Sequence, residues 1–293
     1  INTTISFVDI AGLVKGASKG EGLGNKFLSH IREVDAIIHL IRCFDSDDIQ
    51  NVNSSIDPIR DLEIIETEMM LSDMESIQKR LEKSNKKNLD EDQLQILQIT
   101  SECINENKDI SFLKYEFTKK QLKQSGLLSL KPKIFVCNVD EKSVQIGNNY
   151  SRTFISKFDQ ENTLVISADI ENQINELDID EKKNYMEMIG LKSTGLSLLI
   201  QKAYSILGLE TYFTSGPEET RAWTIKKKAL APEAAGKIHT DFQKGFIRAE
   251  VIAFDDYVGL KVSVNAKNEG KMRLEGKEYQ VAEGDIVVFR YNV

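Results

Sequence analysis

Three short groups of polar residues follow strand-like runs of this sequence, where they could bind a nucleotide. The first is Asp9-Ile10-Ala11-Gly12, which follows the run at 3–8. An aspartate at the end of a parallel strand can hold Mg²⁺ through water, and the glycine lets a backbone N–H approach a terminal phosphate. Taken alone, the pattern D-x-x-G is better explained by an ordinary turn after a strand.

The second group is Asn138-Val139-Asp140-Glu141, which follows the apolar run at 134–137. Nucleotide switches of the P-loop class read guanine at this place with N-K-x-D, whose aspartate accepts two hydrogen bonds from the base. Here Val139 replaces the lysine and Glu141 the aspartate. Adenine lacks the C2 amine that a guanine-reading carboxylate needs. The longer Glu141 therefore weakens a guanine clamp, although N-x-x-E alone is weak evidence.

The third group is Ser167-Ala168, after the run at 163–166. In switch proteins a Ser-Ala backbone turn at this place contacts the base. The dipeptide is uninformative alone, but the order of the three groups is not. Each stands at the carboxyl end of an expected strand, which is where open α/β sheets bind their ligands.

The elements that must position these groups follow from the apolar pattern. Strands are expected over 3–8, 36–41, 134–137 and 163–166, and a short helix over 25–34 after the glycine-dense stretch 12–24. Short, almost wholly apolar runs indicate strands that are buried on both faces of a parallel sheet. Because helical patterns separate them, the sequence predicts an α/β fold with a mostly parallel sheet.

The segment 57–130 interrupts this rhythm with two long helical patterns, separated by the polar stretch 84–88. They predict an antiparallel helical hairpin that projects from the sheet domain. The segment carries 11 basic and 15 acidic residues. Its charge indicates a solvated surface, and an arm that binds a partner is the alternative.

The composition changes near Leu209. From there to the end, 13 basic residues balance 13 acidic ones, so the first 208 residues carry all of the net charge of −8. Strands are expected over 221–225, 247–252 and 285–291, and a helix over about 232–241, with a turn at Glu283-Gly284. The sequence therefore predicts two domains, at 1–208 and 209–293.

Composition excludes several classes of protein. The net charge argues against binding nucleic acid by bulk charge alone. Three widely spaced cysteines supply neither a disulfide framework nor a Cys-rich metal site. No apolar run approaches the roughly 18–20 residues of a membrane helix. A cytoplasmic protein is expected.

Longer stretches resemble one family, the YchF group of Obg-like ATPases, and the resemblance spans essentially the whole chain. The segments that carry it are 7–25 (FVDIAGLVKGASKGEGLGN), 57–61 (DPIRD), 138–141 (NVDE), 216–225 (GPEETRAWTI), 234–242 (AAGKIHTDF) and 283–287 (EGDIV).

The resemblance implies a mostly parallel Ras-like sheet domain with a helical-hairpin insertion at about 57–130, and a C-terminal TGS domain of the β-grasp type. It also implies a cytoplasmic, ribosome-associated switch in translation or stress regulation. The intact protein would be a P-loop ATPase that binds ATP with magnesium and hydrolyses it slowly.

Carried over by position, the resemblance places Asn138, the backbone of Val139, and Glu141 against adenine. Ser167 and Ala168 would close over the base. Asp9 would face the magnesium ion through a water molecule, and Gly12 would face the γ-phosphate.

Position 13 bears on hydrolysis. Ras-like switches have a Gln there that orients the attacking water, whereas this chain has Leu13. The family pattern offers a histidine in the loop after Asp47-Asp48 as an alternative, but Asn51 stands there. The catalytic residue is therefore left open, and slow intrinsic turnover is expected.

The three histidines and Trp223 could each have a structural or a functional role. His39 and His239 are expected to pack in the fold or lie at its surface rather than take part in catalysis. His30 follows the glycine-rich loop and could approach the nucleotide. Trp223, next to Lys226-Lys227-Lys228, is consistent with an RNA contact and equally with a packed strand residue before a solvated turn.

The phosphate-binding motif G-x-x-x-x-G-K-[S/T] does not occur in these 293 residues. The resemblance places it upstream of the strand at 3–8, so we expect a chain of this sequence to bind ATP poorly. Two alternatives stay open: a GTP-dependent translation factor of the same fold, and a non-enzymatic scaffold that binds the ribosome or RNA.

Overall fold

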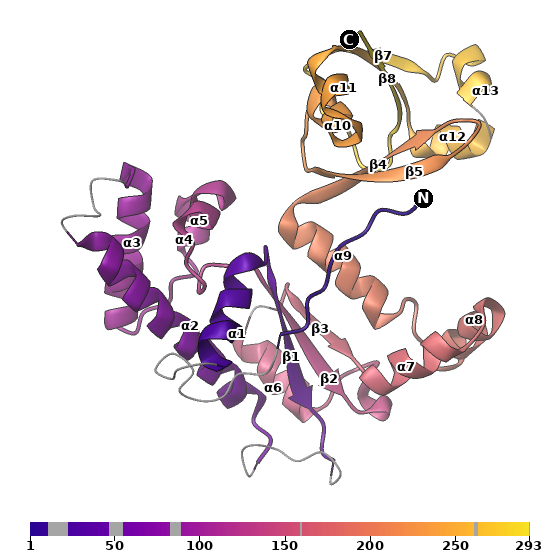
Figure 1. Cartoon of the computed structure of the whole chain (residues 1–293). Coiled ribbons are helices and arrows are strands. Elements are labelled where there is room, and N and C mark those ends of the chain that lie inside the picture. Colours follow the sequence, from indigo (N-terminus) through magenta and orange to yellow (C-terminus); the bar gives the residue numbers. More distant parts are fainter. Residues whose placement is uncertain (11–22, 47–54, 83–88, 159, 261–262, 293) are drawn as a thin grey trace. The chain divides into compact units, whose positions relative to one another are not determined.

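The computed structural model describes residues 1–10, 23–46, 55–82, 89–158, 160–260 and 263–292. The chain forms two compact units, one of Val8–Ala203 and one of Ile1–Phe7 with Tyr204–Val293 (Figure 1). The first unit is built on a parallel sheet and the second on a mixed sheet. The predicted α/β class is confirmed. None of the helices in the described ranges has the length and apolar character to span a membrane.

Three strands form the sheet of the first unit. They are β1 (Ile37–Cys43), β2 (Lys133–Val139) and β3 (Thr163–Ile166), in the order β1-β2-β3 and all parallel. The central strand β2 is buried along most of its length, as its apolar run predicts. Phe135, Cys137 and Val139 on one face of β2 pack with Ile41 and Phe154, among others.

Helices surround this sheet. Those outside the insertion, together with one 3₁₀ turn, are α1 (Leu23–Glu33), η2 (Glu141–Ser143), α6 (Asn149–Lys157), α7 (Ala168–Glu176), α8 (Ile179–Met188) and α9 (Gly195–Leu207). The predicted helix over 25–34 is α1. Asn148 and Ser151 form a capping box that begins α6, and Asp178 and Glu181 form one that begins α8.

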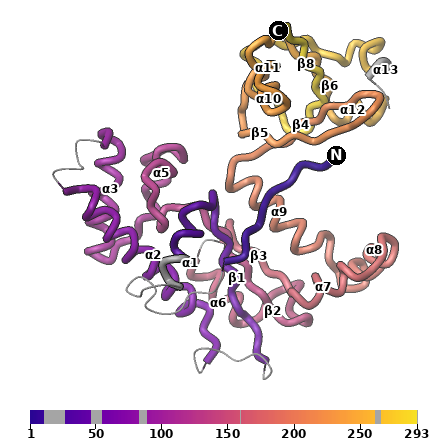
Figure 2. Tube along the Cα trace, in the orientation of Figure 1, coloured from indigo at the N-terminus to yellow at the C-terminus, as the bar shows by residue number. Residues whose placement is uncertain are grey.

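The predicted insertion contains two long helices, α2 (Pro58–Leu81) and α3 (Glu91–Asn105), followed by the short helices α4 (Leu113–Glu116) and α5 (Lys119–Ser125). Asp57 caps α2 by accepting a hydrogen bond from the backbone of Arg60, with Pro58 in the first turn. The two long helices lie side by side (Figure 2), where Ile77 packs with Ile96. The polar tip predicted at 84–88 lies outside the described residues.

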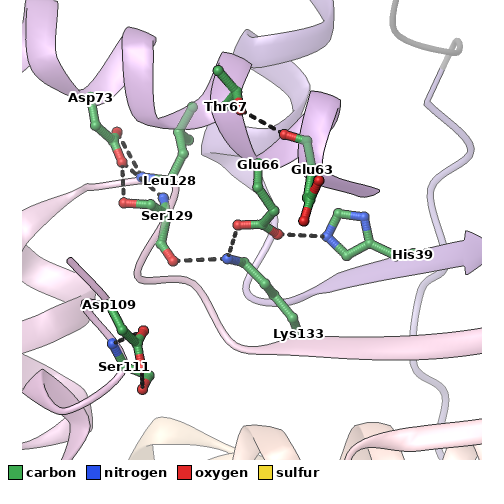
Figure 3. A network of polar contacts seen from close by, with 10 residues as sticks. All are labelled: His39, Glu63, Glu66, Thr67, Asp73, Asp109, Ser111, Leu128, Ser129 and Lys133. Carbon is green, nitrogen blue, oxygen red and sulfur yellow. Dashed lines mark hydrogen bonds and ion pairs between the residues drawn. The ribbon is translucent and has the colours of Figure 1, made fainter. Parts of the chain in front are cut away.

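A polar network joins α2 to the sheet (Figure 3). Glu66 of α2 accepts from the Lys133 ammonium of β2 at 2.6 Å and lies 3.5 Å from Nε2 of His39 on β1. Burial, together with the positive charge of Lys133, lowers the pKa of His39 to about 3. The ring is therefore neutral near pH 7, and His39 is a packing residue, as expected.

His39 makes a testable contribution to acid sensitivity. The unfolded ring takes up a proton near pH 6.5 and the folded ring only near pH 3, so stability is lost as pH falls below 6.5. Between about pH 7.5 and 5.5 we expect His39 to account for roughly 1.4 kcal/mol of the loss in unfolding free energy. Urea titrations of wild type and His39→Gln measure this difference. Exposed His239→Gln is the control, and an equal pH slope in wild type and His39→Gln would refute the assignment.

The second unit has a five-stranded mixed sheet in the order β5-β4-β8-β6-β7. Its strands are β4 (Leu209–Ser215), β5 (Thr220–Lys226), β6 (Phe246–Ile252), β7 (Arg273–Glu275) and β8 (Ile286–Tyr291). Its helices are α10 (Ala231–Ile238), α11 (Thr240–Lys244), α12 (Phe254–Leu260) and α13 (Ser263–Asn268). The buried Tyr212 donates its hydroxyl to the carbonyl of Ala234 at 2.9 Å, which joins β4 to α10.

Three of these strands are the predicted ones, whereas β4 and β7 were not predicted. The predicted helix over 232–241 is divided in two, because the backbone is extended at His239 (φ −159°). The predicted turn at Glu283-Gly284 is present, and Gly284 has the positive φ of 85° that glycine tolerates best.

The strand predicted over 3–8 is wrong. Residues 1–10 are extended but form no strand, and Ile1–Phe7 contacts the second unit. The carbonyl of Ile1 accepts from Ala222 of β5 at 2.9 Å, and the hydroxyl groups of Thr3 and Thr224 lie 2.7 Å apart. Because β5 is an edge strand with free backbone groups, it offers these hydrogen bonds, but they are too few to make a ladder.

Candidate functional site

Two of the sequence groups meet at the carboxyl ends of β2 and β3. In the parallel register Asn138 lies opposite Ile166, so the residues that follow each strand are neighbours. The side-chain oxygen of Asn138 accepts a hydrogen bond from the backbone N–H of Ala168 at 2.9 Å. Asn138 therefore fastens the start of α7 to the end of β2, at the sheet edge where open α/β folds bind ligands.

Val139 and Ser167 present very different groups at this edge. The side chain of Val139 is packed into the core, so its backbone is what remains for a ligand. Ser167 is fully buried, and its hydroxyl has no hydrogen-bond partner among the described residues. It stands at the N-cap of α7 without capping the helix. A buried hydroxyl without a partner costs about 1–3 kcal/mol, so a group outside the described residues is expected to satisfy it.

Glu141 is exposed at the start of η2 and belongs to a chain of hydrogen bonds. Its Oε1 accepts from Nε2 of Gln173 on α7 at 2.6 Å. The Oε1 of Gln173 in turn accepts from the hydroxyl of Tyr185 on α8. Sequence reasoning missed Gln173 and Tyr185, because polar residues on partly exposed helices give no local signal of a contact across elements.

Asp140 has a structural task. It accepts from the hydroxyl of Ser143 at 2.9 and 3.0 Å and from the amide of Asn148 at 3.4 Å. Burial alone would raise the pKa of Asp140, but the hydrogen bonds outweigh it and the pKa is lowered. Asn148 also donates to the carbonyl of Cys43 at 2.6 Å, which ties this loop to the end of β1. The N-x-x-S spacing of the α6 capping box is the signal that could have identified Asn148.

The assignment of Asp9 and Gly12 to magnesium and phosphate stays a prediction. Asp9 is exposed on the extended opening segment. Gly12, Leu13 and Asn51 lie outside the described residues. Within the described ranges, no group of three or more His, Cys, Asp or Glu side chains could hold a metal ion. His30 is exposed on α1, and His239 accepts from the backbone of Asp241 at the start of α11.

The side chain of Trp223 makes most of its contacts within the second unit. Its indole N–H donates to the hydroxyl of Thr214 at 2.9 Å, and the guanidinium of Arg221 lies 4.6 Å from its ring centroid. Its ring packs against the core of the second unit. Lys226, Lys227 and Lys228, by contrast, are all exposed. A hollow of about 710 Å³ lies over α8, and none of the residues predicted to contact the base lines it.

Two family models match parts of the chain. Residues 209–292 match YchF-GTPase_C, described as "Protein of unknown function (DUF933)". Residues 1–73 match MMR_HSR1, described as "50S ribosome-binding GTPase".

Whole-length relatives are also similar. A protein of Bacillus subtilis (strain 168) named "Ribosome-binding ATPase YchF" is 46% identical over 305 residues, which cover 100% of this chain and 83% of that protein. The protein of the same name from Escherichia coli O157:H7 is 42% identical over 299 residues, which cover 99% of this chain and 82% of that protein.

Two solved structures resemble the chain. The "Schizosaccharomyces pombe YchF GTPase" has a TM-score of 0.77 and 33% identity, over 96% of this chain and 79% of that one. A "GTP binding protein from Pyrococcus horikoshii OT3" has a TM-score of 0.57 at 18% identity, over 91% and 81%, and shows the fold alone. The names of the relatives differ in the nucleotide that they give.

Proposed function

This chain belongs to the YchF family of Obg-like ATPases, and on that premise we propose that it is a ribosome-associated nucleotide switch that prefers ATP to GTP. Relatives named as ribosome-binding ATPases support an association with the ribosome and hence a place in the cytoplasm. The family acts on nucleoside triphosphates, so the finer question is which base this chain reads.

The observation that carries the base assignment is the edge formed by Asn138, Ser167 and Ala168. Asn138 holds Ala168 in place, and within the described part of the chain the buried hydroxyl of Ser167 has no hydrogen-bond partner. A nucleobase would supply polar atoms to such a site. We assign the adenine contacts to Asn138, the backbone of Val139, Glu141, Ser167 and Ala168.

Glu141 favours adenine because of the donors that each base presents. Guanine offers a carboxylate two adjacent donors, the N1–H and the C2 amine, whereas adenine offers the C6 amine next to an acceptor at N1. A carboxylate that can use only one oxygen is therefore better matched to adenine.

For the phosphate end, the assignment of Asp9 to a magnesium ion through water, and of Gly12 to the γ-phosphate, remains our proposal. The described residues provide no metal cluster, so phosphate oxygens and water would complete the coordination. The ion would offset the negative charge of the phosphates. Leu13 has no group to orient a water molecule, so slow hydrolysis is expected.

We also propose that residues 209–293 form a TGS domain of the β-grasp type, and that residues 1–208 form the nucleotide-binding domain with its insertion at 57–130. The mixed sheet, with α10 packed on it through Ala231, Ala234 and Ala235, supports the β-grasp assignment.

The base assignment is tested by competition between mononucleotides. This sequence contains no phosphate-binding loop motif. Titration with AMP and GMP, which differ only in the base, therefore measures base recognition separately from recognition of the triphosphate. We expect AMP to bind more tightly than GMP and to shift the NMR amide signal of Ala168. A preference for GMP would favour the GTP-dependent translation factor, and no binding of either would favour the scaffold.

Ribosome association is tested through the lysines after β5. We propose that Lys226, Lys227 and Lys228 contact ribosomal RNA. Replacing all three with Glu should weaken co-sedimentation with ribosomes about tenfold and flatten its dependence on salt concentration. The matched control replaces Lys182, Lys183 and Lys192, near α8, with Glu. An equal loss in the control would show that net charge alone is responsible and would contradict the contact.

A further inference from the structure

Glu141 does not approach the base site as a free carboxylate, because Gln173 engages one of its oxygens. We infer that Gln173, oriented by Tyr185, is a positioning residue that determines base selectivity by engaging one of the two oxygens with which Glu141 could bind the nucleobase. This inference rests on the proposed function, since it requires Glu141 to face the base.

The direction of the hydrogen bonds follows from the chemistry of the groups. An ionised carboxylate only accepts, so Gln173 must turn its NH₂ group toward Glu141, at 2.6 Å. Its carbonyl oxygen then faces Tyr185, whose hydroxyl must donate. The phenol therefore stabilises the amide orientation that the carboxylate of Glu141 requires. Without that donor the Gln173 carbonyl would lose its partner, and the amide would be held less firmly against Glu141.

The elements that carry Glu141, Gln173 and Tyr185 are also held together by other hydrogen bonds. Nε2 of Gln145, in the loop after η2, donates to the carbonyl of Ile189 at the end of α8 at 2.5 Å. At the other end, the Asp178–Glu181 capping box begins α8. The first contact ties the segment of Glu141 to α8, which carries Tyr185, and Asn138 fastens the start of α7, which carries Gln173.

The consequence for selectivity lies in the acceptor sites of Glu141. To clamp guanine, both oxygens of a carboxylate must accept, one from N1–H and one from the C2 amine. Each carboxylate oxygen has about two lone-pair sites, and Gln173 occupies one of those on Oε1 of Glu141. The amine of adenine needs only Oε2, whereas guanine also needs Oε1, which it would have to share with Gln173 or take from it. A hydrogen bond weakened or lost in this way is costly in a site built around polar groups.

The experiment compares the ratio of the GMP and AMP dissociation constants in wild type, Gln173→Leu and Tyr185→Phe. We expect Gln173→Leu to lower the ratio about fivefold and Tyr185→Phe to lower it in the same direction by less. A merely structural role would weaken both nucleotides together and leave the ratio unchanged. Gln201→Leu, an exposed glutamine on α9, is the matched control and should retain the wild-type ratio.

Glu141→Ala separates the two ways in which the inference can fail. If it weakens AMP binding while Gln173→Leu and Tyr185→Phe leave the ratio unchanged, the role of Gln173 is refuted and the proposed function stands. If Glu141→Ala has no effect on AMP, or if wild type shows no AMP binding up to about 10 mM, the base assignment fails and the inference with it. Because Gln173 is exposed, circular dichroism should show that Gln173→Leu keeps the wild-type fold.

Discussion

Glu141→Asp is expected to reverse the base preference, changing the ratio of the GMP and AMP dissociation constants about 100-fold toward GMP. Aspartate is shorter by one methylene, so its carboxylate no longer reaches the amide of Gln173, which now lies 2.6 Å from Oε1. Both oxygens are then free to accept from guanine, and a good bidentate pair discriminates between bases by about 1–3 kcal/mol.

The measurement is a titration with AMP and GMP in parallel, by NMR or calorimetry. Glu187→Asp is the matched control, because Glu187 is an exposed glutamate of α8 in the same unit. If Glu141→Asp bound both nucleotides with the wild-type ratio, Glu141 would not be the residue that reads the base.

Asp73→Ala should be the most destabilising of the changes considered. Asp73 lies fully buried on α2 and accepts from the backbone N–H groups of Leu128 and Ser129, each at 2.8 Å (Figure 3). It also accepts from the Ser129 hydroxyl at 2.6 Å. Alanine would leave these three donors buried without a partner, at a cost of about 3–5 kcal/mol in unfolding free energy.

Urea unfolding of the whole chain measures this loss. Asp73→Asn keeps one oxygen acceptor and should lose less than Asp73→Ala, while exposed Glu75→Ala on the same helix should change stability by less than about 0.5 kcal/mol. Burial raises the pKa of Asp73, and the hydrogen bonds from Ser129 and Leu128 oppose that rise. A loss below about 1 kcal/mol for Asp73→Ala would mean that the freed donors find other partners.

The edge that we propose reads the base could be predicted in part, because its residues directly follow apolar runs. Parallel strands that run side by side end at the same edge, so the runs at 134–137 and 163–166 were enough to bring Asn138 and Ala168 together. The long insertion was also predictable, since its apolar residues recur at helical spacing over α2 and α3.

The opening segment shows that a local sequence pattern does not predict long-range strand pairing. The run at 3–8 specifies an extended backbone, but a strand also requires a partner, and the partner here is the edge strand β5 more than 200 residues away. The hydrogen bonds that this segment makes to β5 are too few to form a ladder, and the sequence pattern contains no information about how many will form. The prediction of a strand was wrong for that reason.

By itself, then, the sequence determined the α/β class and the residues at the strand ends, because both are encoded in short-range spacing of apolar and polar residues. It determined the family through the resemblance of its longer motifs. Only the tertiary structure decided that Gln173 and Tyr185 reach Glu141, that the Ser167 hydroxyl is buried without a partner among the described residues, and that Asp73 ties α2 to the loop before β2. Each of these depends on the packing of elements that are distant in the chain. A hydrogen bond forms where two side chains meet, and that meeting place is set by the fold as a whole.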